Sequence, residues 1–336
     1  MLPEFSGRSP DGSTDAALTN ANANANADAD AECAPVSVVI PVAGRPQLLS
    51  EAIRSVSGGS LKPRELIVVL NAADSVEREA DRAAAERCFQ SGSEDAAAAA
   101  ESPLRCRLVE CESVGPGPAR NAGVALASQP WLAFLDSDDL WAPEKLRRQW
   151  RYLQQRPHLR AAHTAEVWIK DGRELTQPAQ LRPHTGRFLR ASFRHCLISC
   201  SSLLMRRDVF LELGGFDPDF RVCEDFELWL RYLIRYPIGL VREVLTIKRA
   251  GDWPQESRRF HSLDALRIRA ILKLLRTDAE RLTIDELSHA RDACETKLKI
   301  LSQGARRRDR AGEVEPLIQE VEGEFRSAFR KARPGL

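Results

Sequence analysis

The 336-residue sequence predicts an α/β protein with a mixed, mostly parallel sheet flanked by helices and a C-terminal helical appendage. Short aliphatic and β-branched runs, typical of buried parallel strands, alternate with segments that have the apolar spacing of amphipathic helices. Three carboxylates directly follow one of these runs, at the strand end where open α/β sheets bind their ligands. Only helical periodicity remains after residue 255, which predicts the appendage.

Composition argues against several functional classes. The formal net charge of +1 gives no global field to attract nucleic acid or a membrane surface. No apolar run approaches the roughly 20 residues that cross a bilayer, and the N-terminus lacks the order of a signal peptide. The eight cysteines form no CxxC pair. We therefore expect a cytoplasmic protein with reduced thiols, no nucleic-acid partner and no transmembrane segment.

Three regions are predicted along the chain. Residues 1–34 contain an Ala/Asn/Asp repeat and almost no large apolar side chains, so they are expected to be disordered, since they bury too little surface to offset their ordering entropy. Residues 35–255 hold the strands and the motifs. Residues 256–336 form the helical extension.

The main domain opens with a strand, a helix and a second strand, which form a right-handed unit by default. Val36–Pro41 is a β-branched run, Leu48–Val56 has helical apolar spacing, and Glu65–Leu70 is a second buried strand. The next expected elements are a helix over Val76–Phe89, a variable surface excursion over residues 91–100 and a strand over Leu104–Val109.

A Gly/Pro segment, Gly115–Pro118, then enters a helix. A helix N-terminus attracts anions through its free N–H groups and its dipole, and Arg120 and Asn121 are the polar side chains that this one presents. The segment lacks the third glycine of a dinucleotide-binding GxGxxG, so an ordinary turn and cap is the alternative.

The apolar run Trp131–Leu135 predicts a buried strand, and Asp136, Asp138 and Asp139 follow it directly. Carboxylates this close repel one another, and a divalent cation relieves the repulsion. Mg²⁺ is typically held by one or two carboxylates together with substrate phosphates. The alternative is that Asp138 or Asp139 caps the helix that Pro143 helps to begin, and both interpretations can hold together.

A second acidic pair occurs later in the main domain. Glu224 and Asp225 open an amphipathic helix over Phe226–Leu233, where they are either caps or a catalytic pair. Residues 143–155 predict a helix whose cationic face, including Lys145, is solvated. The other expected elements are strands over Ala161–Val167 and Cys196–Met205 and a short helix over Asp208–Gly215.

In their order and wording, these segments resemble the family 2 glycosyltransferases, which have the GT-A fold. The resemblance covers roughly residues 35–250. It implies a nucleotide-diphosphate sugar donor, Mg²⁺ or Mn²⁺, and transfer with inversion to a hydroxyl of a glycan, protein or lipid-linked acceptor. The matching residues are Val36–Pro41 with Leu48–Val56, Glu65–Val69, Ala119–Gly123, Phe134–Asp139, and Leu211–Phe216 followed by Glu224-Asp225 and Leu228-Trp229.

The resemblance assigns roles to the two acidic groups. Asp138 is similar to the metal ligand of the family's DxD motif, and Asp136 to the residue near both metal and ribose. Asp139 is expected to orient the loop and to cap the following helix. Asp225 matches the family's catalytic base, and Glu224 lies beside it.

The resemblance also assigns donor contacts. Arg120 is similar to a family residue near the diphosphate, and Val39, Pro41 and Val42 lie where the family's first strand meets the nucleobase.

Two departures from the family pattern concern the donor and the metal. The usual acidic turn after the second strand is replaced by Leu70-Asn71, so Asn71 or Asp74 is expected to contact the base. In place of a late histidine that completes the metal site in some relatives, the chain offers Asp252 as an oxygen ligand.

Helices at Leu263–Leu275 and Thr283–Leu301 and a mostly solvent-facing final helix are expected in the extension. The basic run Arg306–Arg308 is either a solvated face or a peripheral contact with the inner face of the membrane. The paired helices are a candidate homodimer surface.

Two functions of different classes stay open. The first is a metal-dependent, inverting glycosyltransferase, with hexosyl transfer expected. The second is a GT-A-fold nucleotide-sugar-binding protein without turnover, motivated by the altered nucleobase turn. The retained acidic pairs favour the first.

Overall fold

The computed structural model describes residues 33–96, 104–113, 115–251, 263–307 and 311–332. The predicted disordered segment lies outside the described residues as far as residue 32, whereas Cys33 and Ala34 already belong to the first strand. The predicted boundary at residue 255 and the candidate ligand Asp252 also fall outside the described residues.

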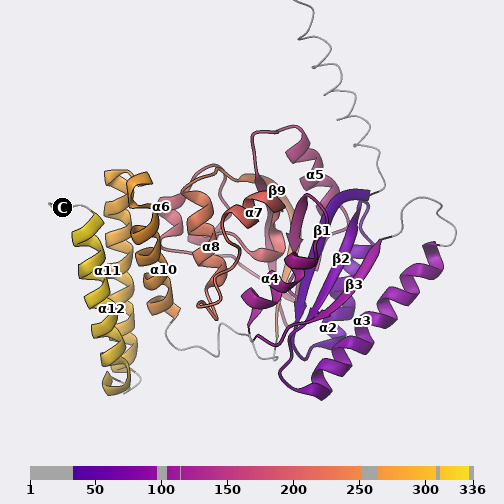
Figure 1. Ribbon diagram of the computed structural model, residues 1–336, viewed down its shortest axis with the longest axis horizontal. Coiled ribbons are helices and arrows are strands. Elements are labelled where there is room, and N and C mark those ends of the chain that lie inside the picture. Colours follow the sequence, from indigo (N-terminus) through magenta and orange to yellow (C-terminus); the bar gives the residue numbers. More distant parts are fainter. Residues whose placement is uncertain (1–32, 97–103, 114, 252–262, 308–310, 333–336) are drawn as a thin grey trace, which may run out of the picture.

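One mixed sheet forms the centre of the described chain (Figure 1). Its order is β3-β2-β1-β4-β8-β6-β9-β5, with β7 paired to β6. The first four strands of this order are parallel, and β8 is antiparallel to both of its neighbours. The strands are β1 (Cys33–Val42), β2 (Lys62–Leu70), β3 (Arg105–Glu110), β4 (Trp131–Phe134), β5 (Leu140–Trp141), β6 (Ala161–Lys170), β7 (Arg173–Leu175), β8 (Leu204–Arg206) and β9 (Gly239–Ala250).

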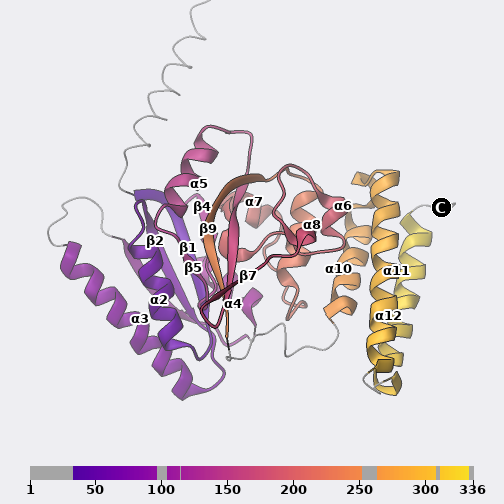
Figure 2. The same ribbon diagram turned by 180° about the vertical axis from the view of Figure 1, so that it is seen from behind.

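Helices cover the sheet and extend the molecule at one end. Both ribbon views place α3 at one end of the molecule and α11 and α12 at the other (Figure 1, Figure 2). The helices are α2 (Pro46–Ser57), α3 (Ser75–Ala96), α4 (Pro116–Leu126), α5 (Lys145–Gln154), α6 (Leu189–Ser192), α7 (Arg207–Glu212), α8 (Glu224–Leu233), α10 (Leu263–Asp278), α11 (Ile284–Arg307) and α12 (Ala311–Ala332).

Alternate residues of β1 and β2 enter two different hydrophobic cores. Val39 and Ile67 belong to a first core with α4, α8 and the C-terminal helices, whereas Val38 and Leu66 belong to a second core with α2 and α5. Strands buried on both faces need apolar residues at consecutive positions, which is the pattern that these segments show. The predicted strands at the start of the chain, and the α/β class, are confirmed.

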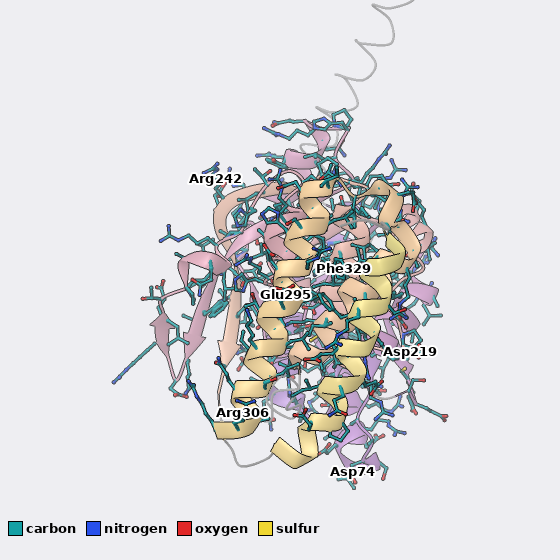
Figure 3. The ribbon with its side chains drawn as sticks, turned by 90° about the vertical axis from the view of Figure 1, so that its left-hand side faces the viewer. Asp74, Asp219, Arg242, Glu295, Arg306 and Phe329 are labelled. Atoms are coloured by element: carbon teal, nitrogen blue, oxygen red, sulfur yellow. The ribbon has the colours of Figure 1, made fainter. Side chains whose placement is uncertain are left out.

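The C-terminal helices share the first core. On α12, Ile318, Val321, Phe325 and Phe329 are spaced by three or four residues and pack into it. Figure 3 looks onto α11 and α12, which lie side by side. Most other described side chains of α12 are exposed or partly exposed, as expected for a mostly solvent-facing helix, and the apolar stripe falls on one helical face.

Two predicted elements differ from the structure. α3 continues through Ala96, so residues 91–96 of the predicted surface excursion are helical, and residues 97–103 lie outside the described chain. Cys196–Met205 holds only a short 3-10 turn, Cys200–Ser202, before β8. The serines of this segment bond to other parts of the chain, as Ser199 does with Glu166, and so hold an irregular backbone.

Lys145 is not on a solvated face. Its side chain is fully buried, its Nζ donates to Gln149 Oε1 at 2.8 Å, and the ammonium lies 3.8 Å from the centre of the Trp141 ring. Burial lowers the pKa of Lys145 well below its ordinary value. The helical pattern alone could not show that α5 turns this lysine toward the sheet.

Candidate active site

The acidic loop after β4 is held by contacts from distant segments. The Asp136 N–H donates to Ser201 Oγ at 3.1 Å, and Ser201 Oγ donates to Asp139 Oδ2 at 2.7 Å. The Arg249 N–H donates to Asp139 Oδ1 at 3.0 Å. Asp139 is buried, and burial raises its pKa to about 7. Asp139 therefore fixes the shape of this loop.

The expected cap is absent from this loop. After Asp139 the chain forms β5, and α5 begins only at Lys145, with Glu144 as an N-cap that makes no side-chain bond. The prediction that Asp138 or Asp139 caps this helix is wrong, because a strand separates the carboxylates from its first turn.

Arg120 joins the two acidic groups. It projects from α4, is 4% exposed, and donates from Nη2 to Asp136 Oδ1 at 2.6 Å and from Nη1 to Glu224 Oε1 at 2.7 Å. Its guanidinium lies 5.3 Å from the centre of the Phe216 ring. The planar guanidinium directs one terminal nitrogen to each carboxylate, in a fixed geometry.

The two carboxylates respond differently to the same partner. Burial alone would raise the pKa of Asp136, but Arg120 and then Lys248 hold it below its ordinary value. Burial raises the pKa of Glu224 to about 7, although Arg120 opposes the rise. Asp136 is thus kept ionised, whereas Glu224 titrates near neutrality.

Asp138 pairs with a residue from the opposite side of the site. Arg45 Nη1 donates to Asp138 Oδ2 at 2.8 Å. The turn that carries Arg45 is fixed by buried Asp81 of α3, which accepts the N–H groups of Gly44 and Arg45 at 2.7 and 2.9 Å. Gly44 has φ +67°, a conformation that favours glycine. A residue on α3 thereby sets the position of the cation beside Asp138.

Asp225 is the second residue of α8, and Cys223, two positions before it, has a left-handed backbone conformation. Cys223 has φ +62°, which is uncommon for a residue with a side chain. Asp225 Oδ1 accepts the Phe226 N–H at 2.7 Å, and Oδ2 accepts the Cys196 thiol at 3.3 Å. Two donors from different directions fix the orientation of this half-buried carboxylate, while Glu224 turns to Arg120.

Lys248 brings a further cation to the site from β9. Burial alone would lower its pKa, but Asp139, Glu166 and Asp136 raise it above its ordinary value. Neither Lys248 nor Arg45 stands in a motif that marked it in the sequence. Both residues reach the acidic loop only because distant segments fold together, and no local sequence pattern records this.

The candidate nucleobase residues lie around the ends of β1 and β2. Pro41 and Val42 are buried, and Val42 O accepts the Asn71 N–H at 2.8 Å. Asn71 Nδ2 donates to Cys111 O and Ser113 O at 2.9 and 2.7 Å, and Oδ1 accepts the Gly115 N–H at 3.2 Å. The amide of Asn71 thus holds the loop that precedes α4.

Asp74 caps α3 in the structure. Its Oδ1 accepts the N–H groups of Val76 and Glu77, each at 2.9 Å. The expected contact with a nucleobase would compete with this cap.

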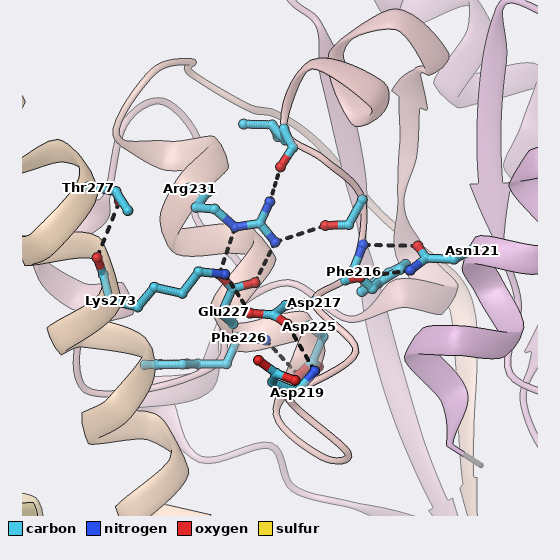
Figure 4. A network of polar contacts seen from close by, with 12 residues as sticks. Asn121, Phe216, Asp217, Asp219, Asp225, Phe226, Glu227, Arg231, Lys273 and Thr277 are labelled. Carbon is cyan, nitrogen blue, oxygen red and sulfur yellow. Dashed lines mark hydrogen bonds and ion pairs between the residues drawn. The ribbon is translucent and has the colours of Figure 1, made fainter. Parts of the chain in front are cut away.

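A polar network links α8 to the C-terminal helix α10 (Figure 4). Buried Glu227 accepts Arg231 Nε and Lys273 Nζ, both at 2.7 Å, and Lys273 also donates to Asp217 at 2.6 Å. Beside it, Asn121 exchanges two hydrogen bonds with the backbone of Phe216, at 2.7 and 3.0 Å. The helix that carries Asp225 is therefore tied to α10.

The residues at the acidic loop fit a divalent cation that also binds a phosphorylated ligand. Within the described residues, no cluster of three or more His, Cys, Asp or Glu side chains could hold a metal by itself. Mg²⁺ is usually bound by one or two carboxylates, with phosphates and water completing its shell. Asp136 and Asp138, two residues apart on one loop, supply that number of carboxylates.

No described helix has the length and hydrophobicity that crossing a bilayer requires.

The chain spans about a third of the length of the first curated relatives that it matches. An uncharacterized glycosyltransferase of Rickettsia conorii is 24% identical over 215 residues, which cover 63% of this chain and 32% of that protein. The amylovoran biosynthesis glycosyltransferase AmsE of Erwinia amylovora is 25% identical over 146 residues, 42% of this chain and 53% of that protein.

Two solved structures share the fold. S. aureus TarS 1-349 in complex with UDP-GlcNAc matches with a TM-score of 0.55 and 16% identity, covering 88% of this chain and 90% of that one. The mannosyltransferase PcManGT from Pyrobaculum calidifontis, in complex with GDP-Man and Mn²⁺, matches with a TM-score of 0.50 and 16% identity, covering 95% of both chains. At this identity the likeness shows the GT-A fold alone. The model of the family described as glycosyl transferase family 2 matches residues 37–214, just over half of the 336 residues, and the chain belongs to that family.

Proposed function

We propose that this protein is a metal-dependent glycosyltransferase that moves a sugar from a nucleotide-diphosphate donor to an acceptor hydroxyl with inversion. One observation carries the proposal: Arg120 holds Asp136 of the acidic loop and Glu224 of α8 at hydrogen-bond distance, 2.6 and 2.7 Å. Family membership supports the reaction class. The names of AmsE and of the succinoglycan biosynthesis protein ExoO of Rhizobium meliloti favour a polysaccharide acceptor.

In this proposal Asp136 and Asp138 would hold Mg²⁺ or Mn²⁺ when the donor binds, and Asp252 remains a candidate for a third ligand. The cation supplies Lewis-acid stabilisation of the charge on the leaving diphosphate. Arg45 and Arg120 stand beside these carboxylates and orient them. Lys248 adds positive charge on the same side, where the leaving group gains negative charge.

Asp225 is the proposed general base. As the acceptor oxygen attacks the anomeric carbon, Asp225 takes the hydroxyl proton, and the bond from that carbon to the diphosphate oxygen breaks. A single displacement inverts the configuration. Among the described residues, one Asp225 oxygen accepts a hydrogen bond from the Phe226 N–H and the other from the Cys196 thiol, so each keeps a further lone pair for the hydroxyl. Glu224, bound to Arg120, positions the helix.

The nucleobase is proposed to lie against Pro41 and Val42 at the end of β1. Asn71 contributes at most through Oδ1, because both Nδ2 hydrogens are donated to backbone carbonyls and a carbonyl oxygen has a second lone pair. This limited contact motivates a screen of several nucleotides. The neighbouring structures contain UDP-GlcNAc and GDP-Man, so both donors belong in that screen.

Calorimetry of these nucleotide-sugars with and without Mn²⁺, followed by donor hydrolysis, tests the proposal. We expect metal-dependent binding and slow hydrolysis. Asp225→Asn should keep donor binding and lose transfer, whereas Asp285→Asn, at an exposed carboxylate on α11, should keep both. Binding without hydrolysis or transfer would support the alternative, a nucleotide-sugar-binding protein without turnover. Normal turnover by Asp225→Asn would exclude that residue as the base.

A further inference from the structure

A basic cluster lies beside the proposed base and has no role in the reaction described above. It consists of Arg267 on α10, Lys297 on α11 and His195 in the loop before Cys196. Arg267 Nη1 and Lys297 Nζ both approach Asp264 Oδ1, at 3.1 and 3.3 Å. One carboxylate thus serves two cations, and the cluster keeps a net positive charge.

Lys297 is buried and bonded within the protein, whereas Arg267 is partly exposed. Lys297 is 4% exposed and also donates to the Arg194 carbonyl at 3.0 Å. The Arg267 side chain is 30% exposed, and its buried Nε has no hydrogen-bond partner among the described residues. A guanidinium carries five donors in a fixed fork, so Arg267 retains donors for a ligand. A buried donor without a partner in a folded protein calls for an explanation.

Two thiols connect the segments of the cluster to the start of α8. Cys223 Sγ donates to the carbonyl of Leu263, one helical turn before Arg267, at 3.9 Å. Cys196 Sγ donates to Asp225 Oδ2 at 3.3 Å. Burial and then Asp225 raise the pKa of the Cys196 thiol, and Arg267 opposes that rise. Arg267 acts in the same way on Cys223, the residue before Glu224. Through these two thiols, α10 and the segment that carries His195 are linked to the helix that carries Asp225.

The field of the cluster is positive at the edge of the site. Burial lowers the pKa of His195, and Lys297 and Arg267 lower it further. Around Asp136 and Asp138, by contrast, carboxylates gather for the donor's metal. A negatively charged acceptor would be repelled by Asp225 and Glu224 unless a cation met its charge. Arg267 is placed to do this.

We propose that Arg267, supported by Lys297, forms an anion subsite that binds a carboxylate or phosphate group on the acceptor while the acceptor's hydroxyl meets Asp225. The inference rests on the proposed function, because it assigns the acceptor side of that reaction. Carboxylate and phosphate can each present two oxygens to the planar fork of a guanidinium, which binds them in a bidentate way. The acceptor is therefore an acidic sugar or a phosphate-bearing chain.

Binding of small probes to the full chain in metal-free buffer tests the subsite. The probes are p-nitrophenyl glucuronide, p-nitrophenyl phosphate and, as the neutral match, p-nitrophenyl glucoside. We expect at least one charged probe to bind about tenfold more tightly than the glucoside, since hydrogen bonds to charged groups are worth that much. The tighter of the two charged probes identifies the sugar acid or the phosphate as the source.

Three variants assign the effect to one residue. Arg267→Gln should lose the preference for the charged probe, and Arg267→Lys should keep part of it. Arg269→Gln is the matched control, because Arg269 lies on the same helix and pairs with exposed Glu320. Equal binding of charged and neutral probes by the wild type would overturn the proposal, as would an unchanged preference in Arg267→Gln.

Donor binding, measured separately, keeps this test apart from that of the function. A protein that binds and hydrolyses nucleotide-sugars without favouring charged probes would refute the subsite alone. A protein that favours charged probes through Arg267 without binding any donor would refute the proposed function alone. Thermal unfolding of Arg267→Gln checks that its fold is intact, and Arg267→Lys supplies a second variant with the charge retained.

Discussion

Replacing Arg120 with methionine removes the cation that buried Glu224 and partly exposed Asp136 share. Methionine keeps an unbranched apolar side chain against the Phe216 ring but donates no hydrogen bond. Both charge-assisted bonds, to Asp136 Oδ1 at 2.6 Å and to Glu224 Oε1 at 2.7 Å, are lost at once.

The expected loss in the free energy of unfolding follows from the burial of the two partners. Removing one member of a buried ion pair costs about 3–5 kcal/mol, because the remaining charge is uncompensated. Asp136, at 29% exposed, recovers part of its hydration, whereas Glu224, at 7%, does not. We therefore expect a loss at the lower end of this range, about 3 kcal/mol, and most of it should come from Glu224.

The loss should depend on pH in a defined direction. The pKa of Glu224 is already raised to about 7 with Arg120 present, and removing Arg120 raises it further. Above pH 7 the wild type gains from the ionised pair, and the variant must either bury a bare charge or take up a proton. Below pH 7 Glu224 is protonated in both proteins, so the loss shrinks.

Urea unfolding of wild type and Arg120→Met at pH 8 and pH 6 measures both effects. Arg326→Met on α12 is the control: this arginine is 68% exposed and pairs with Glu322 at 3.3 Å, so we expect a change within about 0.5 kcal/mol. Arg120→Lys keeps one charge but not the fork, and should fall between the two. A loss in Arg120→Met no larger than that of the control, or one that grows as the pH falls, would refute the reasoning.

Three further predictions concern packing, the α8–α10 contact and pH. Gly123→Ala should lower the free energy of unfolding by about 1–3 kcal/mol in urea, because the added Cβ overlaps valines of β1 and β2; Gly323→Ala, with open space around it, should not. Lys273→Met should cost about 1–3 kcal/mol by leaving the buried carboxylate of Glu227 under-bonded, and an unchanged melting temperature would contradict this. Folded Glu224 keeps its proton up to about pH 7 and an unfolded glutamate releases it near 4.5, so its contribution to stability falls as the pH rises through this window. Glu224→Gln should flatten that slope in guanidinium unfolding, and an unaltered slope would assign the effect to other groups.

The strands that carry the site were predictable because a strand buried on both faces needs consecutive apolar residues, a pattern that is visible in the sequence. β1 and β2 appear in the sequence as unbroken aliphatic runs, and the acidic loop follows β4 as the order of residues indicates. The start of α8 at Glu224 was equally visible, since its apolar spacing begins there.

The partners of these residues were not predictable from the same patterns. Arg120 meets Glu224 across 104 positions of sequence, and Ser201 meets Asp139 across 62. Such contacts depend on which strands become neighbours, and no periodicity records that. The incorrect cap at Asp139 has the same origin, since a two-residue strand, Leu140–Trp141, leaves too short a signal to separate it from the start of a helix.

The first hydrophobic core runs from Val39 in the opening strand to Phe329 in the last helix. The C-terminal helices of this chain therefore cannot be exchanged as an independent unit, because a transplanted α10 must also supply a partner for Glu227. A chimera that takes α8 and α10 from the same parent keeps that pair together. Substitutions in α10 thus have to be matched to the residues of α8 that they contact.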